Sequence, residues 1–183
     1  MNMTQRLQIA AATPEDVVGI TEVIYHGWLD VYPNKEHGIT RDDIEYRFSR
    51  RFMPREIARR QRELEENSKY QKTLVARRGD MIVGVCRVSQ CEVQNFLNAM
   101  YVHPSYHRLR IGTQLWIASQ RYLGSFKRTA VCAAVYNAKA IAFYSCLGFR
   151  DTGRRFASPR LRMHNGSLIP ELEMQKLPLP APF

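Results

Sequence analysis

The chain has 183 residues, of which 45% are hydrophobic, 10% aromatic and 24% charged, proportions that exclude a disordered chain and suit one globular domain. A formal net charge of +10 at pH 7 suits phosphate-bearing ligands, nucleic acid or anionic membrane, and does not choose among them. The apolar runs are too short to span a membrane, and the N-terminus lacks the apolar run of a secretory signal. We therefore expect a cytoplasmic protein with no membrane partner.

Strand-like and helix-like patterns follow one another along the chain. Segments with apolar runs or alternating apolar residues predict strands at 7–12, 70–78, 81–90, 96–102, 129–136 and 169–177. Capping residues such as Thr13, Thr40 and Asn137 help to predict helices at 13–33, 39–52, 54–68, 112–126 and 137–149. This order indicates an α/β domain with a mixed sheet over residues 1–177, followed by an extended proline-rich tail at 178–183.

Two further patterns in the sequence predict a helix face and the state of the cysteines. The helix expected at 112–126 has one apolar face made of Leu115, Ala118, Ser119, Tyr122 and Phe126. The four cysteines show no C-x-x-C pairing and no tight grouping with histidine, so we expect free thiols and no bound metal.

The first segment that suggests chemistry joins the strand at 96–102 to the next helix. His107 to Thr113 contains two arginines and one glycine at the point where that helix begins. A helix N-terminus offers unpaired N–H groups, glycine permits close approach to a ligand, and arginine bonds phosphate strongly. The turn taken alone is equally compatible with a plain loop that carries solvated arginines.

The motifs around this turn resemble the GNAT superfamily of acetyl-CoA-dependent N-acetyltransferases. The family pattern is Val-x-Pro-x-Tyr, then Gln/Arg-x-x-Gly-x-Gly/Ala opening a helix; here Val102–Tyr106 is VHPSY and His107–Gly112 is HRLRIG. Further on, the family's Asn, Phe-Tyr and Leu-Gly-Phe are matched by Asn137, Phe143-Tyr144 and Leu147-Gly148-Phe149. Two departures are His107 for Gln/Arg and Arg110 for the first glycine. Arg110 either adds a cation for the phosphates or obstructs the ligand.

The resemblance covers nearly the whole chain and implies a fold and an activity. The implied fold is a mixed, mostly antiparallel central sheet of about seven strands flanked by helices. The implied activity is transfer of an acetyl group from acetyl-CoA, the cosubstrate, to a primary amine on a small molecule, peptide or protein. The amine would attack the thioester directly in a ternary complex. Many relatives pair as dimers, so a homodimer is compatible with the resemblance.

The resemblance also implies roles for individual residues. The backbone of Met100, Tyr101 and Val102 would pair with the pantetheine arm like an added strand. The pyrophosphate would lie on Arg108, Leu109, Arg110, Ile111, Gly112 and Thr113. Asn137 would bond the pantetheine or orient the following helix. Tyr144 would be the general acid for the leaving thiolate, with an ordinary core aromatic as the alternative.

The base and the acceptor site are less defined. No carboxylate stands out as a base: the strands around the turn offer Asn95, Asn98 and Cys132, Glu92 lies nearby, and ordered water can also carry the proton. Trp28, Asp30 and Tyr32, with Glu36 and Asp43 as further candidates, could hold a cationic acceptor; packing and capping roles are their alternatives.

Two other classes of function stay open. The altered turn and the missing base are compatible with a non-catalytic acyl-CoA-binding module. The charge is compatible with a nucleic-acid-binding domain, although no recognition motif is present and nucleic acid is the less favoured partner.

Overall fold

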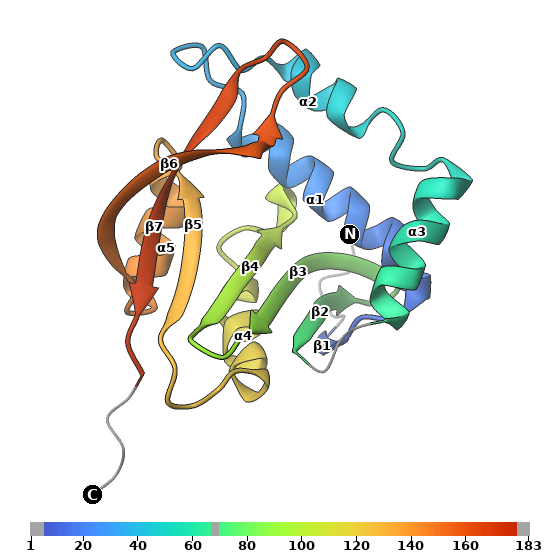
Figure 1. Ribbon diagram of the computed structural model, residues 1–183. Coiled ribbons are helices and arrows are strands. Elements are labelled where there is room, and N and C mark those ends of the chain that lie inside the picture. Colours follow the sequence, from blue (N-terminus) through green and yellow to red (C-terminus); the bar gives the residue numbers. More distant parts are fainter. Residues whose placement is uncertain (1–5, 67–69, 179–183) are drawn as a thin grey trace, which may run out of the picture.

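The computed structural model describes residues 6–66 and 70–178, so most of the expected tail, 179–183, lies outside the described residues. Figure 1 shows a single twisted sheet with the strand order β1-β2-β3-β4-β5-β7-β6. Its strands are β1 Leu7–Ala11, β2 Gln71–Arg78, β3 Met81–Gln90, β4 Asn95–Val102, β5 Thr129–Ala134, β6 Arg150–Arg162 and β7 Leu168–Lys176. All neighbours are antiparallel except β4 and β5, which confirms the mixed, mostly antiparallel sheet of seven strands.

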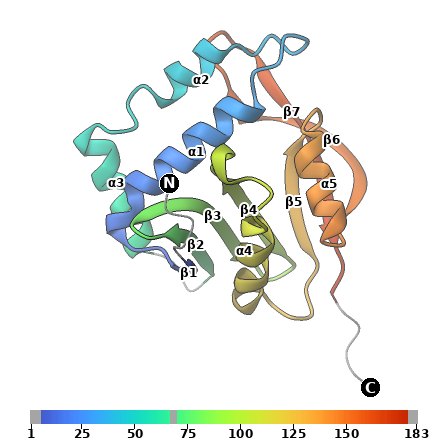
Figure 2. The same cartoon turned by 180° about the vertical axis from the view of Figure 1, so that it is seen from behind.

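Helices cover both faces of this sheet. They are α1 Val17–Val31, α2 Arg41–Phe48, α3 Pro54–Glu65, α4 Ile111–Ser119 and α5 Ala138–Cys146, with short 3-10 turns at Pro14–Asp16, Pro104–Tyr106 and Gln120–Tyr122. Because side chains alternate along a strand, Val75 and Val85 pack with α1 and α3, whereas Leu74 and Cys86 pack with α4 and α5. Figure 2, seen from behind, shows α4 and α5 in front of the strands.

The two halves of the sheet diverge between β4 and β5. These strands pair only from Asn95–Leu97 to Thr129–Val131. Beyond that point β4 stays bonded to β3, β5 stays bonded to β7, and no described strand pairs with the two inner edges. A register shift leaves Asn98 as an extra residue in β4, and such bulges bend a strand. The sheet therefore opens at the end where α4 and α5 begin (Figure 1).

Two predictions about elements were wrong. The helix expected at 112–126 ends at Ser119, and Phe126 is 73% exposed in a loop instead of lying on an apolar face. Buried Asn95 holds this loop, because its side-chain amide bonds both the carbonyl (2.9 Å) and the N–H (3.0 Å) of Gly124. The strand β6 was not predicted, since its arginine-rich sequence has no continuous apolar face. It is an edge strand, and β7 is its only partner strand among the described residues.

Candidate active site

A cavity of about 1070 Å³ occupies the opening between β4 and β5. Its walls come from the free edge of β4, the facing part of β5, and the N-terminal turns of α4 and α5. One end reaches the turn before α4, and the other reaches the last turns of α1 and the strand β7. A long cavity with a helix N-terminus at one end can take an extended ligand with a phosphate group at that end.

The turn before α4 has an unusual backbone. Arg108 and Arg110 both adopt the left-handed conformation, with φ of 63° and 58°. Arg110 is the N-cap of α4, and the first helical bond runs from the Gln114 N–H to its carbonyl (3.1 Å). The preceding N–H groups therefore have no acceptor within the helix. Arg110 takes up a left-handed backbone conformation that glycine would adopt more easily.

Gly112 is required for packing inside the protein. A Cβ atom built at this position would lie 3.1 Å from Cζ of Phe143 on α5. The glycine thus lets α5 approach the first turn of α4, in addition to any close approach by a ligand. The neighbouring Leu109 is 50% exposed and, unlike the other five residues of the predicted phosphate turn, does not line the cavity.

The edge of β4 is open along Met100, Tyr101 and Val102. Their partners on the other side are Cys86, Val85 and Gly84 of β3, so the edge toward β5 has no strand beside it. A side-chain nitrogen of His107, Nε2, lies 2.9 Å from the carbonyl oxygen of Val102. His107, which stands where the family has Gln or Arg, therefore bonds the strand that precedes the turn.

Asn137 and Tyr144 reach the cavity from α5. Oδ1 of Asn137 accepts a hydrogen bond from the Ala140 N–H (3.0 Å), which confirms the predicted N-cap. The Tyr144 ring packs against Phe143 and Phe149 and is 6% exposed, and burial raises its pKa. Its hydroxyl has no hydrogen-bond partner among the described residues. The hydroxyl oxygen is not completely buried, and Tyr144 lines the cavity, so the hydroxyl is accessible from the cavity. Tyr144 thus combines the core position and the site position that the sequence left as alternatives.

Aromatic hydroxyls form the far end of the cavity. The buried Tyr101 hydroxyl accepts from Nε1 of Trp28 (3.1 Å) and lies 3.3 Å from the hydroxyl of Tyr32. Burial raises the pKa of both tyrosines, so each is neutral at ordinary pH. Asp30 also lines the cavity, 3.6 Å from Nζ of Lys139 on α5. All three predicted acceptor residues therefore meet at this end.

Glu171 on β7 is a residue that the sequence reasoning missed. Its carboxylate lines the cavity, and it has no hydrogen bond or ion pair with any described residue. Burial raises its pKa. The next acid along the strand, Glu173, is paired with Arg154 (3.2 Å). A signal was present, because Glu171 and Glu173 alternate with the buried Leu172 and Met174 and must share one face of the strand.

The motif positions and the cavity agree with a comparison to known families. The profile of the acetyltransferase (GNAT) family matches residues 36–149, which is more than half of the chain. The chain belongs to the GNAT acetyltransferase family. Members of this family transfer an acyl group, and acetyl-CoA is the cosubstrate that membership assigns to this acetyltransferase. No curated protein matches the chain.

Solved structures share the fold of this GNAT acetyltransferase. The PaiA N-acetyltransferase of Thermoplasma acidophilum, solved in complex with coenzyme A, is 20% identical with a TM-score of 0.63, over 94% of this chain and 99% of that one. A GCN5-related N-acetyltransferase of Rhodopseudomonas palustris is 20% identical with a TM-score of 0.67, over 97% and 99%. Ard1 of Thermoplasma volcanium is 16% identical with a TM-score of 0.61, over 95% and 99%.

The weaker candidates of this GNAT acetyltransferase lie outside the cavity or are bonded elsewhere. Glu36 does not line the cavity, and the Asp43 carboxylate accepts from the Thr40 N–H at the start of α2 and from Nδ2 of Asn165 (both 2.9 Å). Glu92 is exposed in the loop before β4, and Asn98 lines the cavity but bonds the Ser89 hydroxyl (2.8 Å). In the part of the chain that the structure describes, no cluster of three metal-ligating side chains occurs, and no helix is long and apolar enough to cross a membrane.

Proposed function

We propose that the protein is an N-acetyltransferase that moves the acetyl group of acetyl-CoA to a primary amine by direct attack in a ternary complex. The observation that carries this proposal is the continuous cavity along the unpaired edge of β4. It joins the helix N-terminus at Arg110 to a buried end that holds Tyr144 and Glu171. An extended thioester with phosphates at one end and its reacting carbon at the other matches this layout.

The cosubstrate would bind through backbone groups and two arginines. Its pyrophosphate would lie on the free N–H groups of the α4 N-terminus, with Arg108 and Arg110 adding charge-assisted bonds. The pantetheine amides would pair with the backbone of Met100 to Val102 as a short added strand. A backbone N–H on that edge would polarise the acetyl carbonyl as negative charge develops on its oxygen.

Tyr144 would protonate the leaving thiolate. Burial raises the phenol's pKa, which makes it a weaker acid in isolation. The thiolate would be desolvated in the same surroundings, and desolvation raises the pKa of a thiol as well. Because both pKa values rise together, the proton transfer stays close to balanced and depends mainly on proximity.

Glu171 would be the general base. An amine must lose its proton to attack a thioester, and a carboxylate with a raised pKa accepts a proton more readily than an ordinary one. Glu171 has no competing partner among the described residues and lies on β7, across the cavity from the edge of β4. It would take the proton directly or through one ordered water.

The test combines calorimetry with a turnover assay. Titration with acetyl-CoA should give binding in the micromolar range, and free thiol should then appear with suitable amines. Binding without turnover of any amine would favour the non-catalytic acyl-CoA-binding module. An absence of binding would contradict the proposal and would mean that the Arg110 side chain obstructs the turn. The next assay would then test whether the protein forms a salt-sensitive complex with duplex DNA of random sequence.

A further inference from the structure

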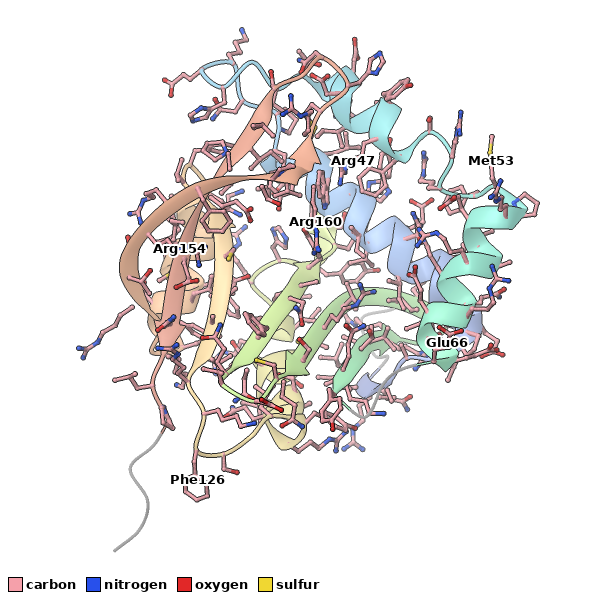
Figure 3. The ribbon with its side chains drawn as sticks, in the orientation of Figure 1. Arg47, Met53, Glu66, Phe126, Arg154 and Arg160 are labelled. Atoms are coloured by element: carbon pink, nitrogen blue, oxygen red, sulfur yellow. The ribbon has the colours of Figure 1, made fainter. Side chains whose placement is uncertain are left out.

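Arg47 on α2 is exposed and lies beside Trp28, which lines the end of the cavity away from the phosphate turn. Its guanidinium lies over the ring of Trp28, 4.7 Å from the ring centre. Nη2 and Nη1 donate to the backbone carbonyls of Arg160 (2.9 Å) and Arg162 (3.4 Å) on β6. In Figure 3 the labelled side chains of Arg47 and Arg160 lie where the end of β6 meets α1. The cation is therefore held in place by an aromatic face and two neutral oxygens.

No carboxylate among the described residues balances this charge. None of the three acids on the same helix has an ion pair with Arg47: Asp42 is exposed, the Asp43 carboxylate accepts from the Thr40 N–H (2.9 Å), and Glu45 accepts from the Tyr25 hydroxyl (2.5 Å) and pairs with Arg41 (3.5 Å). The titratable groups within electrostatic reach of Arg47 are Tyr32 and Tyr101, which are neutral at ordinary pH and line the cavity. The exposed Arg160 side chain beside it also has no hydrogen bond or ion pair among the described residues.

Glu171, which lines the cavity with Tyr101, carries the opposite charge. Its carboxylate has no partner among the described residues, and both Glu171 and Arg47 lie within electrostatic reach of the half-buried Tyr101 hydroxyl. Glu171 is half-buried, so its unpaired charge is costly unless a ligand brings a complementary group, whereas the exposed Arg47 is solvated until a ligand reaches it. A ligand with an amine alone would satisfy only Glu171.

We infer that the acceptor carries a carboxylate or phosphate a few bonds from its primary amine, and that Arg47 binds that anionic group with Arg160 as a second cation. This inference rests on the proposed function and names its acceptor class. The anion would use the guanidinium N–H groups that β6 leaves free, and the amine would face Glu171. An aminocarboxylate and a peptide with an acidic residue next to its N-terminus offer the same chemistry.

The experiment compares matched amines that differ only in the anion. The small pair is 4-aminobutyrate and its amide, and the peptide pair has Glu or Gln as second residue. We expect the wild-type protein to favour the acidic member of at least one pair by roughly ten- to hundredfold in kcat/KM, the range of a charged hydrogen bond. The pair that shows the preference identifies the source of the anion.

Variants of Arg47 and Arg160 test which residue causes the preference for the acidic amine. Arg47→Gln should abolish it mainly through KM, and Arg47→Lys should restore part of it. Arg160→Gln should weaken it and is a safe second variant, because its side chain has no bond within the described residues. Arg55→Gln, an exposed arginine on α3 that does not line the cavity, removes the same charge and should keep the preference.

Two results would overturn the inference while leaving the proposed function intact. One is turnover of neutral or cationic amines at rates equal to those of acidic ones. The other is an equal loss on both members of a pair in Arg47→Gln, which would indicate a purely structural tie between α2 and β6. Absence of acetyl-CoA binding, by contrast, would remove the proposed function and this inference together.

Discussion

Among single residues, Tyr144 has a buried ring and a hydroxyl that opens into the cavity. Replacement by phenylalanine keeps the packing and removes only the acid. We expect Tyr144→Phe to lower kcat about a hundredfold, the low end for general acid catalysis, with the affinity for acetyl-CoA unchanged. Turnover kinetics and calorimetry on the same preparation check both parts. A variant with wild-type kcat would remove Tyr144 from the mechanism.

Glu171 should control the acidic side of the pH–rate profile. Burial raises its pKa, and a general base works in its ionised form, so activity should increase as pH rises through that raised pKa. In Glu171→Gln the acidic limb of the profile, the rise of activity with pH, should disappear, and kcat should fall by roughly a hundredfold or more. Glu65→Gln, an exposed acid on α3, is the matched control and should keep the limb. An unchanged limb in Glu171→Gln would assign the base elsewhere.

The same raised pKa predicts an effect of Glu171 on stability. The folded protein binds this proton more tightly than the unfolded chain, so folding loses stability as pH rises from about 4.3, the ordinary value, through the raised pKa. Glu171→Gln should therefore raise Tm at pH 7, and the gain should disappear below about pH 4. Thermal unfolding at several pH values measures this. A lower Tm at pH 7 would contradict the burial argument.

Among the elements, the turn before α4 combines backbone strain with charge. Arg110→Gly and Arg110→Ala both remove the guanidinium, but only glycine relieves the left-handed conformation at φ 58°. We expect both variants to bind acetyl-CoA more weakly. The free energy of unfolding of Arg110→Gly should also be about 1 kcal/mol larger than that of Arg110→Ala, because a left-handed residue with a Cβ atom typically costs this much. Denaturant unfolding and calorimetry separate the two effects.

For the molecule as a whole, the net charge of +10 should steer a polyanionic cosubstrate. Raising the ionic strength from about 0.1 M to about 1 M shortens the Debye length from about 10 Å to about 3 Å. Acetyl-CoA affinity should fall roughly tenfold over this range, whereas acetyl-pantetheine, which lacks the nucleotide phosphates, should bind equally at both. Equal salt dependence of the two ligands would indicate that the phosphates do not contact Arg108 and Arg110.

The sequence alone was sufficient for features that neighbouring residues determine. Thr40 and Asn137 cap their helices as predicted, because a cap bonds N–H groups three residues away. Gly148 ends α5 with φ of 89°, as its position in the motif suggested. The turn before α4 also follows from a local strand–turn–helix motif. This turn lies at the end of the cavity proposed for the cosubstrate.

The acceptor end was decided by the tertiary structure. Glu171 lines the cavity only because β7 inserts between β5 and β6, and Arg47 lies beside the cavity-lining Trp28 with its guanidinium bonded to Arg160, 113 residues along the chain. The divergence of β4 from β5 likewise depends on which edges pair and on the bulge at Asn98. Long-range pairing leaves little trace in local patterns, since many pairings satisfy the same alternation of apolar residues. The sequence therefore determined the family and its cosubstrate, and the fold determined which charges surround the acceptor.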